Sequence, residues 1–311
     1  MIFESALIVI QQIFVIFILI GIGFLAAKFE LLREDGARQI TDLLLVIVIP
    51  CVIIMAFQAS FERSLLKNLL IAALVAALTH AAGILISQLI FKNEALERKR
   101  MLTYSTVFFN AGFFSLPLLR ALLGETGVLY GSVFVAVFNL FAWTYGIRLM
   151  NGGGGATKWK TFLNPGIISL LIALLLVLFN IRLPDLVQTT LRYITGLHTP
   201  LAMIVIGCQF YLLRDNFNLR DLALWKTVLA RNILVPLLML TLIFYLAQDK
   251  TLFFASVITT AAPTATNTIL FATRYRKDVN TAVQTVILTT LLTIITIPLI
   301  MAVAMLLKGT L

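Results

Sequence analysis

The chain has 311 residues, of which 60% are hydrophobic and 12% are charged, and its mean hydropathy is +1.02. Soluble globular proteins do not have this balance, so the composition excludes them and predicts an all-α polytopic membrane protein. The formal net charge is +10, but the Lys and Arg residues fall between apolar segments, where they set topology. This distribution argues against nucleic acid as a partner.

Five apolar segments long enough to cross a bilayer precede a glycine-rich stretch. The predicted spans are 7–27, 40–58, 69–91, 101–123 and 128–150. Gly21 and Gly23 in the first span suit close helix packing. The fourth span is unusual, because Asn110-Ala-Gly-Phe-Phe-Ser-Leu-Pro117 lies at its centre. Gly and Pro break a helix, and backbone groups freed in hydrocarbon are tolerated only where protein or a cavity satisfies them.

Five further spans follow the stretch that begins with Asn151-Gly-Gly-Gly-Gly155. This stretch lacks the Gly-Lys-Ser/Thr ending of a phosphate-binding loop, so it is interpreted as a linker. The predicted spans are 165–180, 186–213, 222–247, 252–272 and 279–307. The ninth span is also broken, since residues 259–268 carry several Thr residues together with Pro263 and Asn267.

Ten spans divide into a first repeat (residues 1–150), a cytoplasmic linker (151–160) and a second repeat (161–311). The second and seventh spans carry central prolines, Pro50 and Pro200, and the fourth and ninth carry the polar breaks. Because five is odd, the second repeat is inverted in the membrane relative to the first. The sequence therefore predicts two inverted five-helix repeats in which the broken helices 4 and 9 cross.

Basic residues predict the orientation. Sixteen of the 24 Lys and Arg residues fall in the loops on one side of the ten spans, and seven fall on the other side. The positive-inside rule places the first set in the cytoplasm, so both termini are expected outside.

At each break, a half-helix presents its N-terminus at mid-membrane, where free amides and partial positive charge favour an anion such as a carboxylate. The alternative is a pair of proline-kinked helices whose polar groups bond one another without a ligand. The candidate substrate-binding residues are Asn110, Gly112, Ser115, Pro117, Pro263, Thr264, Thr266 and Asn267.

Four other polar residues could couple transport or support the site. His80 could relay protons or bond a neighbouring helix. Arg231, a costly charge within a span, could contact substrate, pair with a helix C-terminus or snorkel. Asp42 could bind a coupling ion or pair with a cation, and Asn139 could buttress the crossing or bond a neighbouring helix.

No enzyme or metal constellation occurs in the sequence. It lacks His-Glu-x-x-His, Gly-x-Ser-x-Gly and paired intramembrane aspartates, and Cys51 and Cys208 are expected to be packed thiols. We expect no enzyme activity, no metal site and no cofactor, and the coupling ion, proton or sodium, stays open.

Four motifs in order resemble the auxin efflux carrier family: the segment Asn110 to Pro117, Asn164-Pro165, Thr199-Pro200-Leu-Ala-Met and Ala262-Pro263-Thr-Ala-Thr-Asn267. They look most like its prokaryotic members, the malate or malonate permeases. The resemblance implies a fold similar to bile acid sodium symporters, with helices 1, 2, 6 and 7 as a dimerising scaffold and helices 3–5 and 8–10 as a transport domain.

In plant members of this family, asparagines and prolines at the crossing contact the auxin carboxylate; the matching residues here are Asn110, Pro117, Pro263 and Asn267. Plant members also have a long hydrophilic loop where this chain has only 151–160, so their loop-based regulation and their substrate do not transfer.

These features together predict a secondary active transporter of small organic anions that works by alternating access in a bacterial inner membrane, as a homodimer. The alternatives are a uniporter or channel-like facilitator for small solutes and a membrane-embedded sensor.

Overall fold

The computed structural model describes residues 2–60, 65–151, 165–179, 181–212 and 218–309. These residues are almost entirely helical, and the described part of the chain has one isolated β-bridge. The expected linker at 151–160 and the expected start of the sixth span at Asn164 lie essentially outside the described residues.

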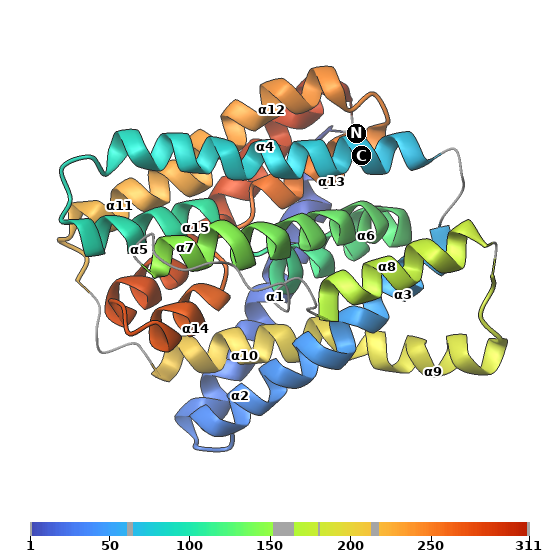
Figure 1. Ribbon diagram of the computed structural model, residues 1–311, viewed down its shortest axis with the longest axis horizontal. Coiled ribbons are helices and arrows are strands. Elements are labelled where there is room, and N and C mark those ends of the chain that lie inside the picture. Colours follow the sequence, from blue (N-terminus) through green and yellow to red (C-terminus); the bar gives the residue numbers. More distant parts are fainter. Residues whose placement is uncertain (1, 61–64, 152–164, 180, 213–217, 310–311) are drawn as a thin grey trace.

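The described residues of the first half form seven α-helices, some of them joined by π-helical turns into longer rods (Figure 1). They are α1 (Ile2–Lys28), α2 (Glu34–Leu43), α3 (Ile49–Ser60), α4 (Leu66–Ile90), α5 (Leu96–Val107), α6 (Leu116–Phe141) and α7 (Ile147–Met150). The π-helical turns are Leu44–Val48, Ala111–Ser115 and Ala142–Gly146. Gly124 has φ 63° and ψ −156°, so it divides the α6 rod into two helices, as the turn after the predicted fourth span requires.

The second half contains eight α-helices within the described ranges. They are α8 (Pro165–Leu178), α9 (Asp185–Gly196), α10 (His198–Leu212), α11 (Leu222–Val228), α12 (Val235–Leu246), α13 (Lys250–Thr260), α14 (Asn267–Arg274) and α15 (Val279–Lys308). A π-helical turn, Leu229–Leu234, joins α11 to α12. Residues 261–266 separate α13 from α14, so the ninth predicted span is interrupted at Pro263.

Seven helices within the described ranges are long and apolar enough to cross a membrane, which shows a polytopic membrane protein. Three of the ten predicted spans are not among them. The fourth and ninth are interrupted by the breaks, since α5, α13 and α14 have 12, 11 and 8 residues and the rod from Ala111 to Met150 counts as one. The sixth is represented by α8, which has 14 residues within the described ranges. Large apolar side chains such as Ile18, Leu70 and Leu299 are exposed, as lipid-facing residues are.

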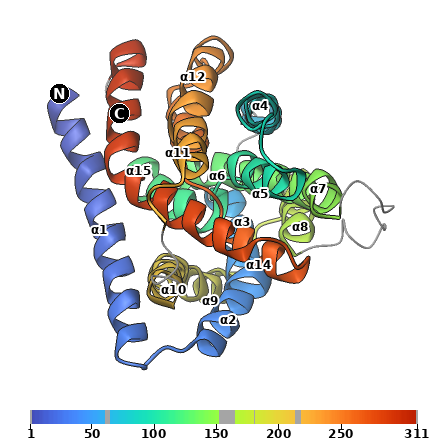
Figure 2. The same cartoon turned by 90° about the vertical axis from the view of Figure 1, so that its left-hand side faces the viewer.

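The helices can be described as two groups, which also contact each other through the pairs α3–α6, α1–α15 and α6–α8. In the first group, α1 packs along α10, and α3 packs against α8 and α9. In the second group, α4 packs against α5, α6 and α12, while α15 packs against α11, α13 and α14. Figure 2 shows α2, α9 and α10 together, on the side of the molecule opposite α4 and α12. The start of α1 and the end of α15 lie near each other in both views (Figures 1 and 2).

Glycine allows the close contact between α1 and α10. A Cβ atom on Gly23 would lie 2.1 Å from the Ile204 carbonyl oxygen, and one on Gly207 would lie 1.9 Å from the Ile20 carbonyl oxygen. Neither backbone could approach so closely past a side chain. The predicted packing role is therefore confirmed for Gly23, whereas Gly21 faces open space.

Candidate substrate site

The two breaks meet and pair through their backbones. Phe109 and Thr264 form an antiparallel bridge, flanked by hydrogen bonds from Asn110 N to Pro263 O (2.8 Å) and from Ala265 N to Phe108 O (2.9 Å). We call this pair of segments, 108–110 and 263–265, the crossing. Each break therefore satisfies backbone groups of the other, which makes extended backbone tolerable inside a membrane protein.

Asn110 begins the half-helix that follows the first break. Its side-chain Oδ1 accepts hydrogen bonds from Phe113 N (3.1 Å) and Phe114 N (3.2 Å), as an N-cap residue does. Its backbone carbonyl accepts a bond from the Ser115 hydroxyl (3.1 Å). The Nδ2 group is buried and has no partner within the described structure. Asn110 thus caps the half-helix with one end of its amide and leaves two N–H donors for another molecule.

Hydrogen bonds of threonine residues hold the crossing in place. The Thr264 hydroxyl donates to Ser105 O (2.7 Å), and Thr264 N donates to the Thr289 hydroxyl (3.1 Å) on α15. The Ser105 hydroxyl lies 2.9 Å from that of Thr285, one turn earlier on α15. These bonds fix the extended segment in place, so Thr264 builds the crossing and its hydroxyl is already engaged.

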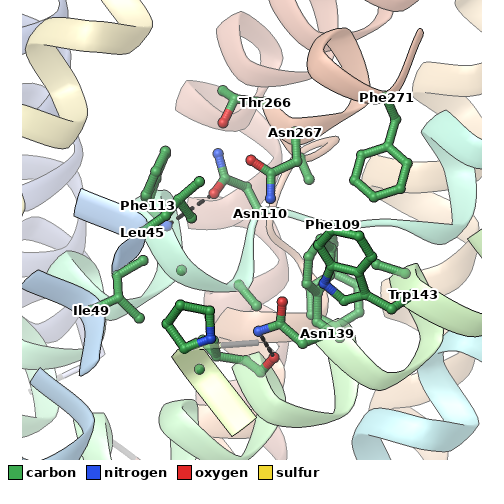
Figure 3. A pocket seen from close by; sticks show the side chains of 18 of the residues that line it. Leu45, Ile49, Phe109, Asn110, Phe113, Asn139, Trp143, Thr266, Asn267 and Phe271 are labelled. Atoms are coloured by element: carbon green, nitrogen blue, oxygen red, sulfur yellow. Dashed lines mark hydrogen bonds between the residues drawn. The ribbon is translucent and has the colours of Figure 1, made fainter. Parts of the chain in front are cut away.

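A cavity of about 240 Å³ lies against the crossing (Figure 3). Its walls come from both helix groups: the region around Leu44–Val48 and the start of α8 on one side, and the crossing, α6 and α14 on the other. Among the predicted residues, Asn110, Gly112, Thr266, Asn267, Asp42 and Asn139 line it. Pockets for drug-sized ligands begin at about 300 Å³, so this cavity suits a small molecule.

The lining is mostly apolar, with a few polar groups. Five aromatic residues contribute: Phe109, Phe113, Phe138, Trp143 and Phe271. The polar groups are three amides, the Thr266 hydroxyl and the carboxylate of Asp42, whose residue is exposed. Asn139 already donates to Val135 O at 2.9 Å, whereas Figure 3 shows the amides of Asn110 and Asn267 on the same side of the cavity. The lining residues include no Lys, Arg or His, and their only charged member is Asp42, so amide donors and half-helix N-termini are the groups in the wall that favour an anion.

Other predicted residues lie in the crossing or behind it, outside the cavity lining. Ser115 and Pro117 belong to the half-helix after Asn110, and Pro263 supplies a carbonyl to the crossing. His80 lies behind Phe109, with ring centroids 4.9 Å apart, and its Nδ1 lies 2.8 Å from the Ala76 carbonyl oxygen of its own helix. Its other ring nitrogen, Nε2, is buried without a partner in the described structure.

Arg231 also lies behind the crossing and is not a cavity residue. Its side chain is fully buried, and its guanidinium donates to the carbonyls of Thr106 and Thr260. Of the three interpretations that the sequence left open, the geometry matches pairing with helix C-termini.

Two sets of residues carried no signal in the sequence. The aromatic lining comes from three stretches of the chain, 109–113, 138–143 and Phe271, and Phe is common throughout an apolar chain. The supporting threonines, Thr285 and Thr289, lie one turn apart on one face of α15, and this spacing was the only local hint of a shared partner.

Comparison with known proteins gives two matches. The sequence model of a family described as "Membrane transport protein" matches residues 8–158 and 154–301. An uncharacterized transporter of Methanocaldococcus jannaschii is 23% identical, in an alignment that covers 92% of this chain and 96% of that protein.

Proposed function

Because the chain belongs to the membrane transport protein family, the auxin efflux carrier family that its motifs indicated, we propose that it is a secondary transporter of small organic anions. The substrate is a carboxylate that binds in the cavity beside the crossing. Membership of the family supports the transport function, and the chemistry of the cavity lining supports the substrate class.

The single observation that carries the carboxylate is the unpartnered Nδ2 group of Asn110, in a residue that lines the cavity. A buried amide without a partner costs free energy, which a carboxylate oxygen would recover by accepting its hydrogen bond. The half-helix that Asn110 caps adds partial positive charge at the same point. Asn267 is the first residue of α14, so it lies at the N-terminus of the second half-helix, as Asn110 does at the N-terminus of the first.

The location of the cavity supports alternating access. Its walls are shared between the α1–α3/α8–α10 group, the proposed scaffold, and the α4–α7/α11–α15 group, the proposed transport domain. Sliding or rocking of one group against the other would carry the crossing past the scaffold and change its exposure. The shared location of the chain ends agrees with an even number of crossings, as two inverted five-helix repeats require (Figures 1 and 2).

On the proposed topology, the cavity lining also supports an inward-facing state. Asp42, Trp143, Pro165 and Phe271 are near the ends of their spans that adjoin the 28–38, 151–160 and 274–278 loops. In the proposed topology, with both termini outside, these loops are cytoplasmic, so the cavity belongs to an inward-facing state. The proposed location is a bacterial inner membrane, and the proposed assembly is a homodimer.

A uniporter or channel-like facilitator is the second candidate, since the same cavity could pass a solute down its own gradient. The sequence has no phosphate-binding loop, so an ion gradient or the substrate gradient supplies the driving force. A membrane-embedded sensor is the third candidate, and it would bind ligand without flux.

A thermal-shift screen tests the ligand class. Purified protein is heated with acetate, benzoate, malonate or malate, each with sodium or with choline as the counter-ion. A ligand at about 100 times its Kd stabilises the folded state by about 2.7 kcal/mol, so a bound carboxylate raises the melting temperature. Asn267→Ala should lower the shift, and Gln248→Ala, a change at an exposed residue just after α12, should preserve it. Equal shifts in all three proteins would contradict a site at the crossing.

A further inference from the structure

Arg231 occupies a place where two half-helices end. It lies in the π-helical turn Leu229–Leu234, and its side chain has no exposed surface. Nη1 donates to the carbonyl of Thr106 at 3.3 Å, and Nη2 donates to the carbonyl of Thr260. Thr106 is in the last turn of α5, and Thr260 is the last residue of α13. One guanidinium therefore bonds the C-terminal ends of both helices that lead into the crossing.

The two helix ends provide the counter-charge for this cation. A helix C-terminus carries partial negative charge, because its last carbonyls have no intrahelical partners. Within the described ranges, no carboxylate lies within ion-pair distance of Arg231. The Phe109 ring, whose centroid lies 5.2 Å from the Arg231 Cζ atom, adds a favourable π-face. The positive charge of Arg231 is thus stabilised by the C-terminal ends of α5 and α13 and by the Phe109 ring, all of which adjoin the crossing.

We propose that Arg231 is a built-in cation of the crossing: its guanidinium offsets the partial negative charge of the two helix C-termini, so the crossing needs no bound sodium ion there and transport proceeds without sodium. Arg231 is a positioning residue, since it acts by holding the two breaks in register and leaves the cavity lining to other residues. This inference rests on the proposed transport function and narrows its coupling ion.

Two physical points support independence from sodium. The carbonyls of Thr106 and Thr260, which could coordinate sodium, already accept hydrogen bonds from the guanidinium. The positive charge of the guanidinium also repels a sodium ion that would bind beside these carbonyls. Arg231, α5 and α13 also belong to the same helix group, so the cation travels with the crossing when that group moves. The charge of the crossing then stays constant during the transport cycle.

The experiment compares the wild-type protein, Arg231→Ala, Arg231→Lys and Asn232→Ala in proteoliposomes and by thermal unfolding. Asn232 is the matched control, because it is the buried neighbour of Arg231 and donates to Thr289 O (2.8 Å) without carrying charge. Uptake of radiolabelled malonate and benzoate is measured in sodium, potassium and choline chloride, with and without millimolar methylguanidinium.

The wild-type protein should show equal uptake and equal melting temperature in all three salts. Arg231→Ala should lose at least about tenfold in uptake and melt earlier, and methylguanidinium should restore part of both, because a free guanidinium can fill the vacated place. Arg231→Lys should keep uptake independent of sodium. Asn232→Ala should gain nothing from methylguanidinium.

Three results would overturn the inference: sodium-dependent uptake or binding by the wild-type protein, wild-type behaviour of Arg231→Ala in choline, or equal rescue of Asn232→Ala. If Arg231→Ala does not fold, the salt panel on the wild-type protein and on Arg231→Lys still decides. If the wild-type protein transports neither probe, the proposed function fails. The role of Arg231 at the crossing is then still tested by whether methylguanidinium raises the melting temperature of Arg231→Ala.

Discussion

Replacing Asn110 with Asp separates the two roles of this side chain. The Oδ1 atom caps the half-helix by accepting bonds from Phe113 N and Phe114 N, and the unpartnered Nδ2 group is available to a substrate. Aspartate keeps an acceptor for the cap and replaces the donor with a second acceptor. Asn110→Asp should therefore keep the helix cap and bind a carboxylate poorly, whereas Asn110→Ala should lose both functions.

The sizes of the effects on stability and on binding follow from typical energies of helix caps, hydrogen bonds and charge repulsion. Asn and Asp are about equal as N-caps, so the cap itself should change by only a few tenths of a kcal/mol in Asn110→Asp. The second carboxylate oxygen of Asn110→Asp is buried where Nδ2 has no partner, and this burial adds a further cost. Loss of the cap in Asn110→Ala should cost about 0.5–2 kcal/mol. A hydrogen bond to a charged group contributes about 1.5–3 kcal/mol, so loss of the Nδ2 donor should weaken binding roughly 10- to 100-fold. Repulsion between two carboxylates, on the order of 4 kcal/mol at 4 Å, weakens it further in Asn110→Asp.

The assay pairs thermal unfolding of the ligand-free protein with a binding isotherm for whichever carboxylate stabilises the wild-type protein most. The expected pattern is weak binding by both variants, with the helix cap kept in Asn110→Asp and lost in Asn110→Ala; both should melt below the wild type, Asn110→Asp because it buries a carboxylate oxygen without a partner. Binding by Asn110→Asp within twofold of wild type would refute the reasoning, because the variant has no amide donor at this position.

Three further predictions concern the structural elements that position the site, and each is checked by the melting temperature of the purified variant. Gly207→Ala should destabilise by about 1–3 kcal/mol or more, because its Cβ would meet the Ile20 carbonyl oxygen at 1.9 Å, whereas Gly21→Ala, in open space, should be nearly neutral; equal effects would contradict close α1–α10 packing. Thr289→Val should cost about 1–3 kcal/mol by leaving Thr264 N–H without its acceptor, and Thr293→Val, whose hydroxyl bonds only its own helix, should cost less. Gly124→Ala should cost about 1–3 kcal/mol because φ 63° with ψ −156° suits only glycine, and a neutral result would show that the kink is absent in the membrane.

The breaks could be predicted from the sequence because they violate a strong rule. In an apolar span, Asn, Gly and Pro next to one another are costly unless the freed backbone groups find partners, so their presence in two spans indicated paired segments. The bridge between Phe109 and Thr264 is the physical form of that pairing. The packing role of Gly23 followed from the same kind of argument.

The division of labour within each break could not be predicted. Both Thr264 and Thr266 are polar residues at the second break, yet the Thr264 hydroxyl bonds Ser105 O and Thr266 lines the cavity. That difference depends on how the extended segment is turned about its own axis, which local sequence does not encode. The partners of Arg231 were also inaccessible, because Thr106 and Thr260 lie 125 and 29 residues away and are contacted through their backbone carbonyls.

The number of long apolar helices in the structure differs from the number of spans predicted from the sequence. The fourth and ninth predicted spans are divided by breaks and no longer contain a helix of membrane length, and the sixth is described only as the 14-residue helix α8, so counting long apolar helices yields seven within the described ranges. The same interruption that hides the ninth span from such a count creates the N-terminus of α14 in the cavity wall. The ten-span inverted repeat stays a prediction, and a reporter fused to the C-terminus tests it, because ten spans with the proposed orientation place that end outside.

Counterflow in proteoliposomes tests the central claim most directly. Vesicles that contain the purified protein are loaded with unlabelled carboxylate, diluted into the same labelled compound, and followed over time. A carrier that exposes the crossing cavity to one side at a time should show saturable, transient accumulation of label above equilibrium, and Asn110→Asp should abolish it. Label that only equilibrates, without saturation and without overshoot, or an overshoot that Asn110→Asp leaves unchanged, would contradict an alternating-access carboxylate carrier with its site at the crossing.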